Sequence, residues 1–200
     1  MEKDASWAKR FSMVKERHKK TFEKAVKEGK ADKQMHSLCR FVSLSKEFFT
    51  SSSCAGRIIL LQLPKNENKR EASFHRKWHR KVGEKEIWEG IEAETKGELW
   101  FKLDPFILHI GAAKLEGARK ILECMKKAGV KRGGIIVAKP GKFLVEMQGT
   151  QAIAFPVKRG KKALVGKEFL EYILDRANEK LGQNYEMLKR LEKVFRQELK

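Results

Sequence analysis

A continuous apolar stripe after Gly166 limits the fold of this chain more than any other feature. Its members recur every three or four residues, which places their side chains on one face of a helix. The stripe consists of Phe169, Ile173, Ala177, Leu181, Tyr185, Leu188 and Phe195. A helix over residues 166–198 with such a face needs a large apolar surface to bury it. We therefore expect a long C-terminal helix that covers a β-sheet.

The residues before this helix alternate between helical and strand patterns. Apolar residues at helical spacing predict helices over 4–28, 32–47, 84–94 and 113–128. Asp32 is the expected N-cap of the second helix, and Gly129 is suited to end the fourth. Apolar and β-branched runs bounded by turn residues predict strands over 58–63, 74–82, 98–102, 106–110, 134–138, 143–148 and 152–157. Residues 64–73 are polar and are expected to form a connecting loop.

This order of elements predicts an α+β protein with a mixed β-sheet covered by helices. We expect a single domain over residues 1–200, with N-terminal helices at 4–47, a sheet-containing core at 48–157 and the C-terminal helix at 166–198. The sequence lacks a strand followed by a glycine-rich turn that opens a helix, which is the fingerprint of the doubly wound nucleotide-binding fold. A Rossmann-type architecture is therefore not expected.

The charge balance points to a polyanionic partner. The formal net charge is +19 and the isoelectric point is about 9.9, so nucleic acid is the leading candidate. No apolar run is long enough to span a bilayer, and no secretory signal is visible. We therefore expect a cytoplasmic protein that binds no membrane, and we favour a monomer.

The cysteines and histidines are too scattered for a metal site. Cys39, Cys54 and Cys124 are odd in number and widely spaced, which predicts reduced thiols and no zinc site. Cys39 and Cys124 are expected in the core. His18 falls in the apolar stripe of the first helix, where it is expected to be a partly buried residue at the edge of the core.

Residues 49–57, with the sequence FTSSSCAGR, form the most distinctive polar segment. Small hydroxyl residues, a thiol and a glycine leave backbone N–H groups accessible, and Arg57 adds a planar set of donors. The segment is therefore interpreted as a loop that binds an anion. A tight turn, in which Gly56 supplies backbone freedom and the serines satisfy local N–H groups, is the alternative.

This segment resembles the signature of a small family, the third protein of tRNA wybutosine synthesis. Three further stretches resemble the same family in the same order: Lys77-Trp78-His79, the segment 104–110 with sequence DPFILHI, and the helix 112–128 followed by GVKRGGI. The resemblance extends over roughly residues 49–157. The flanking helices agree in character.

The resemblance implies a methyltransferase that uses S-adenosylmethionine. Its implied acceptor is ring nitrogen N-4 of a tricyclic wybutosine precursor, which carries an aminocarboxypropyl arm and lies 3′ to the anticodon of phenylalanine tRNA. Such a transfer depends mainly on holding two ligands in register.

The same resemblance implies the site residues. It assigns cofactor binding to Ser52, Ser53, Cys54, Gly56 and Arg57. These residues would hold a carboxylate, either that of the methionyl group or that of the precursor's arm. Cys54 is interpreted as lining the pocket rather than as a nucleophile.

Two further groups would serve catalysis and RNA binding. His109 lies in an apolar strand and is the expected proton acceptor or orienting donor, with Asp104 as the alternative base or as a turn residue. Lys77, Trp78 and His79 would contact RNA. Alternation along a strand prevents Trp78 and His79 from facing the same side, so Trp78 either stacks on a base or packs in the core.

The residues alone leave a second function open. A basic chain without a recognisable catalytic motif also fits a non-catalytic RNA-binding module, in which the serine-rich segment binds a phosphate. Such a module would have no reason to bind S-adenosylmethionine.

Overall fold

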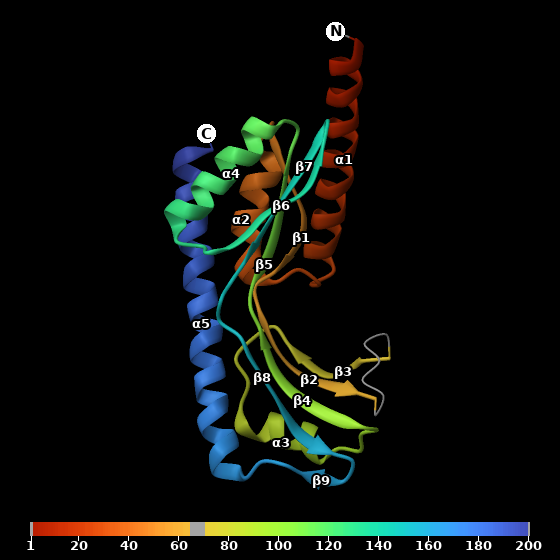
Figure 1. Cartoon of the computed structure of the whole chain (residues 1–200), viewed down its shortest axis with the longest axis vertical. Coiled ribbons are helices and arrows are strands. Elements are labelled where there is room, and N and C mark those ends of the chain that lie inside the picture. The colour runs from red at the N-terminus through yellow and green to blue at the C-terminus, as the bar shows by residue number, and fades with distance from the viewer. Residues whose placement is uncertain (1, 65–70, 200) are drawn as a thin grey trace. The chain divides into compact units, whose positions relative to one another are not determined.

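The computed structural model describes residues 2–64 and 71–199, so part of the expected loop at 64–73 lies outside the described residues. Five helices and nine strands are assigned in these ranges (Figure 1). The helices are α1 Glu2–Lys27, α2 Lys33–Leu44, α3 Glu84–Glu92, α4 Leu115–Ala128 and α5 Lys167–Glu198. The strands are β1 Phe48–Cys54, β2 Arg57–Leu63, β3 Ser73–Trp78, β4 Glu98–Asp104, β5 Ile107–Ala112, β6 Arg132–Lys139, β7 Lys142–Gln148, β8 Ile153–Arg159 and β9 Lys162–Ala163. The α+β class is confirmed.

The strands form two sheets instead of the single mixed sheet that was expected. The first has the order β1-β5-β7-β6 and the second has the order β3-β2-β4-β8-β9. Every pair of neighbouring strands is antiparallel. The mixed sheet was wrong because strand direction depends on pairing between distant segments, which apolar periodicity does not report.

The chain divides into two compact units. Unit 1 contains Met1–Ala55, Phe106–Thr150 and Tyr185–Lys200, and unit 2 contains Gly56–Pro105 and Gln151–Asn184. The expectation of a single domain stays a prediction. Helix α5 contributes its first part to unit 2 and its last part to unit 1.

The sheet of unit 1 is covered on one face by a large apolar core. Leu108 and Ile110 of β5 point into it, together with side chains of α2, α4 and the end of α5 such as Leu38, Ile121 and Phe195. Cys39 and Cys124 lie in this core, as expected, and none of the three cysteines, all of which are described, forms a disulfide.

The other face of this sheet is partly covered by α1. Phe11 of α1 packs against Phe49 and Leu144 of the sheet, and the imidazole of His18 stacks on the Phe49 ring at 5.2 Å. The expectation of His18 at the edge of a core is confirmed. Gly111 lies opposite Phe49 in β5, and its missing side chain makes room for that ring, since a Cβ there would collide with it.

Element bounds differ from the expectations in a few places. Helix α2 ends at Leu44 instead of residue 47, and β3 ends at Trp78 instead of residue 82. Strand β9 was not foreseen. Gly129 adopts a left-handed conformation directly after α4, which confirms its role at the helix end. In the part of the chain that the structure describes, no helix is both long and apolar enough to cross a membrane.

Candidate functional site

The serine-rich segment is a strand and not a loop. Residues 48–54 form β1, the edge strand of the sheet of unit 1, and pair with β5. Ser52 lies opposite His109, Ser53 opposite Leu108 and Cys54 opposite Ile107. The expected loop was wrong because small polar residues also suit an exposed edge strand, where one side of the backbone stays unpaired by other strands.

The end of β1 already binds an anionic group from within the protein. The backbone N–H of Ala55 donates a hydrogen bond of 2.7 Å to Oδ2 of Asp32. Asp32 occupies the N-cap position of α2 as expected, yet its side chain makes no capping hydrogen bond there. The sequence predicted that backbone N–H groups of this segment bind a carboxylate. At Ala55 the carboxylate is that of Asp32.

Strand alternation separates the residues expected to bind the cofactor. Ser53 receives a hydrogen bond of 3.6 Å from the thiol of Cys39, so its side chain points toward α2. Burial raises the pKa of that thiol to about 11. Ser52 and Cys54 point to the opposite face, the face that carries His109. Ser52 and Cys54 are therefore placed together, and Ser53 is not.

His109 has a carboxylate partner that sequence reasoning missed. Its Nε2 lies 2.8 Å from Oε2 of Glu146, the residue directly across from it on β7. The side chains are 18% and 31% exposed, so the pair is shielded without being sealed from solvent. A neutral imidazole beside a carboxylate must donate from the facing nitrogen, because the carboxylate only accepts. Nδ1 of His109 is then the proton-accepting atom.

Tyr185 is a second residue that the sequence did not mark as functional. Burial, followed by the charges of Asp32 and Cys54, raises its pKa to about 12. The phenol therefore keeps its proton at any physiological pH and adds a hydroxyl donor near the end of β1. It appeared in the sequence only as one member of the apolar stripe of α5.

Arg57 and Asp104 are neighbours in unit 2. They are directly opposite on β2 and β4, and Nε of Arg57 donates to Oδ2 of Asp104 at 3.0 Å. Lys102 approaches the other oxygen of the same carboxylate at 3.4 Å. Both carboxylate oxygens of Asp104 are thus occupied by cations, and the carboxylate holds the Arg57 side chain in position. The role of Asp104 as an alternative base stays a prediction.

Gly56 has a backbone role. Its φ of 100° lies in the region that side chains rarely adopt, and a Cβ there would press against Leu181, Asn184 and the carbonyl of Asp104. Glycine at this position lets the chain pass directly from β1 into β2, with Arg57 as the first residue of that strand.

The three residues expected to contact RNA are not on one face. Trp78 is opposite Ile58 and Lys77 is opposite Ile59, so their side chains point to opposite sides of the sheet of unit 2. Trp78 also helps to lower the pKa of Glu86 to about 2, after the larger effects of Arg80 and the Gly83 backbone. His79 follows the last residue of β3.

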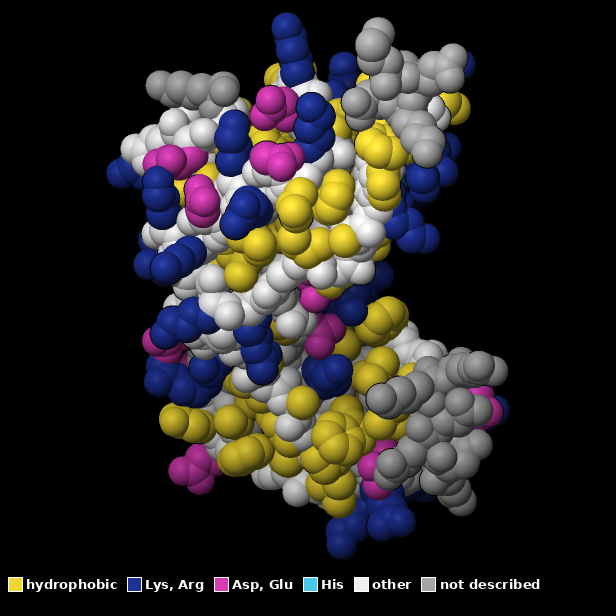
Figure 2. Space-filling model, turned by 45° about the horizontal axis from the view of Figure 1, so that its top comes forward, with side chains coloured by type: hydrophobic (Ala, Val, Ile, Leu, Met, Phe, Trp, Pro, Cys, Tyr) yellow, Lys and Arg dark blue, Asp and Glu magenta, His cyan; other side chains and the backbone are white. Residues whose placement is uncertain are grey.

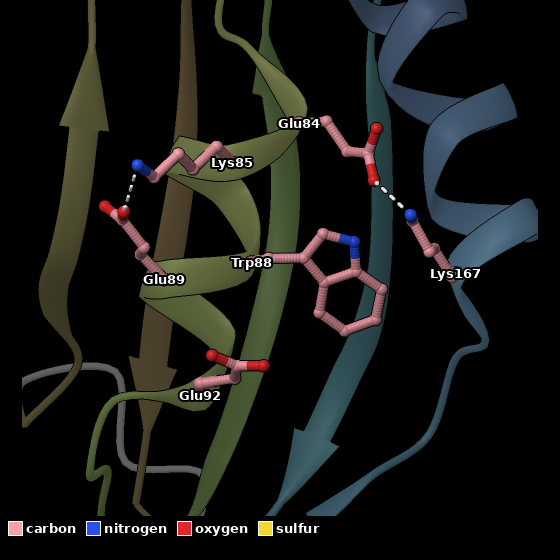
Figure 3. Close-up of a pocket in the computed structure, with 6 residues that line it drawn as sticks. All are labelled: Glu84, Lys85, Trp88, Glu89, Glu92 and Lys167. Carbon is pink, nitrogen blue, oxygen red and sulfur yellow. Dashed lines mark ion pairs between the residues drawn. The ribbon is translucent and has the colours of Figure 1, made fainter.

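A pocket of about 570 Å³ lies beside α3 in unit 2 (Figure 3). None of the site residues expected from the sequence lines it. Trp88 forms its centre, and Glu84, Lys85, Glu89, Glu92 and Lys167 surround it. Two of its carboxylates pair with lysines, Glu84 with Lys167 at 3.5 Å and Glu89 with Lys85 at 4.0 Å. This acidic rim is unsuited to a phosphate backbone.

The fold and the polar residues define an α+β protein with antiparallel sheets, a serine-rich edge strand and a histidine–carboxylate pair, without a doubly wound nucleotide-binding sheet. The family model described as methyltransferase TYW3 matches residues 8–197. The chain belongs to this family.

Relatives in the archaea agree with this assignment. The chain is 34% identical to a tRNA(Phe) 7-((3-amino-3-carboxypropyl)-4-demethylwyosine(37)-N(4))-methyltransferase 1 of Pyrococcus horikoshii, over 92% of this chain and 95% of that protein. The enzyme of the same name from Pyrococcus furiosus is 33% identical over 91% of this chain and 95% of its own length. A solved structure of the PH1069 protein from Pyrococcus horikoshii superposes with a TM-score of 0.86 at 31% identity, covering 94% of this chain and 97% of that one.

Proposed function

We propose that this chain transfers a methyl group to ring nitrogen N-4 of the 7-(3-amino-3-carboxypropyl)-4-demethylwyosine nucleoside in phenylalanine tRNA. The observation that carries the proposal is the match of residues 8–197 to the methyltransferase family. Relatives named for this reaction at 33–34% identity over nine-tenths of the chain support it. The net charge of +19 suits an RNA substrate.

The methyl donor is proposed to be S-adenosylmethionine, which supplies a methyl group bonded to a positively charged sulfur. Each unit by itself holds groups that suit the amino-acid end of this donor. In unit 1, Ser52 offers an exposed hydroxyl on the His109 face. In unit 2, Arg57 offers a guanidinium, the group that best matches a carboxylate. Cys54 lies on the same face as Ser52 and would line the site as a small, polarisable wall. Asp104 would orient Arg57.

His109 is proposed to remove the proton from the acceptor nitrogen. The nitrogen gains a methyl group and must lose the hydrogen that it carries, and Nδ1 of His109 takes this hydrogen while Glu146 stabilises the imidazolium that results. Glu146 thus acts as a positioning residue, because it selects the tautomer in which Nδ1 is free to accept.

The test is a methyl-transfer assay with labelled S-adenosylmethionine and phenylalanine tRNA that bears the precursor with its aminocarboxypropyl arm. After nuclease digestion, a mass gain of one methyl group on that nucleoside is expected. A tRNA that lacks the arm serves as the control for the acceptor. Tight, salt-sensitive tRNA binding without any mass gain would contradict the proposal and favour a non-catalytic RNA-binding module.

A further inference from the structure

An apolar row crosses four strands of the sheet of unit 2. Phe74 of β3 is opposite Leu61 of β2, Leu61 is opposite Trp100 of β4, and Trp100 is opposite Pro156 of β8. Directly opposed residues in antiparallel strands point to the same face. The four side chains therefore form one continuous strip, named here the Phe74–Pro156 row.

Both helices of unit 2 lie on the other face of this sheet. Leu60 of β2 meets Gly90 of α3, where an added Cβ would press on the leucine side chain. Phe101 contacts Phe155, which in turn contacts Phe169 of α5. Since strand neighbours alternate between faces, the Phe74–Pro156 row is on the side that the helices of this unit leave open.

The row is accessible within its unit. Phe74 is 50% exposed, and Leu61, Trp100 and Pro156 are half-buried. Figure 2 shows hydrophobic side chains gathered in the lower half of the molecule beside the grey segment, with Lys and Arg side chains nearby. Contiguous exposed apolar patches are uncommon on proteins and usually mark a binding surface.

Both aromatic rings of the row are held in place. The indole Nε1–H of Trp100 donates to Oε2 of Glu98 at 3.2 Å. The Phe74 ring has the guanidinium carbon of Arg57 4.8 Å from its centroid and Nζ of Lys77 at 5.4 Å. Rings with fixed orientation lose little conformational freedom when a flat ligand stacks on them.

A row of cations runs beside the aromatic row on the same face. Lys77 of β3 is opposite Ile59 of β2, and Ile59 is opposite Lys102 of β4. The spacing of two residues along β2 between Ile59 and Leu61 keeps both rows on one side of the sheet. Aromatic rings flanked by lysines form the arrangement that proteins use to bind single-stranded nucleic acid.

We propose that this face binds the unpaired bases of the RNA substrate, with Phe74 and Trp100 as stacking surfaces and Lys77 and Lys102 as phosphate contacts. The inference rests on the proposed function in that it takes RNA as the substrate. It replaces Trp78 as the stacking residue, because Trp78 points to the opposite side from Lys77.

The test compares two labelled RNA hairpins, one with a normal single-stranded loop and one whose loop nucleotides lack bases. The full-length protein is expected to bind the normal hairpin more tightly, by roughly 5- to 150-fold for each base that stacks. Phe74→Leu and Trp100→Leu are each expected to lose the contribution of one stacked base, and Trp100→Phe to keep it. Lys77→Ala and Lys102→Ala are expected to weaken binding to both hairpins and to reduce the salt slope by about 0.7 each.

Tyr172→Ala is the matched control, because it removes an aromatic side chain that is 62% exposed on α5. It should leave both affinities unchanged. Circular dichroism checks that the variants fold. If a Trp100 variant does not fold, Phe74→Leu alone tests the proposal, because the Phe74 side chain is half-exposed and its replacement disturbs packing less. Wild-type affinities for both hairpins in Phe74→Leu would overturn the inference. So would a change in sedimentation with unchanged RNA affinity, which would make this face an interface between copies.

Failure of the proposed function would look different. A protein that prefers the normal loop through Phe74 but transfers no methyl group to tRNA would retain this inference and contradict the enzyme. A protein that methylates tRNA while Phe74→Leu binds both hairpins as the wild type does would retain the enzyme and overturn the inference.

Discussion

His109 and Glu146 face each other across β5 and β7, with Nε2 and Oε2 2.8 Å apart. Each of these polar side chains stands in an otherwise apolar strand, and each provides the hydrogen-bond partner that the other needs. The pair leaves Nδ1 of the imidazole as the acceptor.

Removing the carboxylate should slow methyl transfer more than it weakens binding. In Glu146→Ala we expect kcat to fall by about 10-fold or more, because the imidazole loses the group that orients it, and in His109→Gln by about 100-fold. Glu146→Gln, whose amide oxygen can still accept the Nε2–H, should lie between the wild type and Glu146→Ala. Single-turnover rates measured across pH check this. Equal rates and pH profiles for Glu146→Ala and the wild type would show that the pair is only structural.

Arg57 should serve the cofactor and not the RNA backbone. In Arg57→Ala we expect methyl transfer to be lost and tRNA affinity to change only slightly. Lys102→Ala is the control, since Lys102 pairs with the same Asp104 carboxylate but lies in the proposed RNA-binding row. Calorimetric titration with S-adenosylmethionine measures cofactor binding by each variant, and tRNA binding at several salt concentrations measures its phosphate contacts. If Arg57→Ala instead reduces the salt slope by about one and binds the cofactor normally, Arg57 is a phosphate contact.

Gly111 should be intolerant of any side chain. A Cβ at this position would enter the ring of Phe49, which is 1% exposed and packed against Phe11. Gly111→Ala is expected to lower the free energy of unfolding by about 2 kcal/mol or more through overpacking. Gly134→Ala, in the same sheet and with open space at its Cβ, is the control. Chemical denaturation of both variants gives the comparison, and equal midpoints would contradict the packing described.

His18 should make the protein less stable in mild acid. Burial, followed by the charges of Arg17 and Lys142, lowers its pKa below 6.5. The unfolded chain therefore binds a proton at a pH where the folded chain does not. The contribution of His18 to stability is full above its ordinary pKa of about 6.5 and is lost as the pH falls from there through the lower pKa of the folded state. Thermal unfolding midpoints between about pH 5 and pH 8 check this. His18→Gln should show a shallower decline; an identical decline would assign the effect to other groups.

The cysteines should differ in their reactivity. Cys39 is fully buried with a pKa raised to about 11, whereas Cys54 is half-buried on the face that carries His109. With iodoacetamide near pH 8, Cys54 is expected to be alkylated well before Cys39. Peptide mass spectrometry follows each site, and protein unfolded in urea provides the control in which all three thiols react. Faster labelling of Cys39 in the folded protein would contradict its placement in the core.

Several features of this protein could be predicted from local patterns. The apolar stripe after Gly166 located α5 to within a residue at its start, and Gly129 marked the end of α4. His109 was identified as a candidate because a histidine in an apolar strand needs a partner or a pocket. These predictions succeed because helix periodicity and turn residues act over a few neighbouring positions.

Other features required the tertiary structure. Glu146 carried the same signal as His109, an ionisable residue in an apolar strand, but its importance depends on pairing between residues 37 positions apart. The serine-rich strand, the separation of Ser53 from Ser52, and the Phe74–Pro156 row likewise depend on which strands are neighbours. The sequence by itself determined the helices, most strands and the family resemblance. Strand order and direction were decided by the tertiary structure, because every strand offers the same backbone donors and acceptors and only the joint burial of distant apolar faces selects which strands pair.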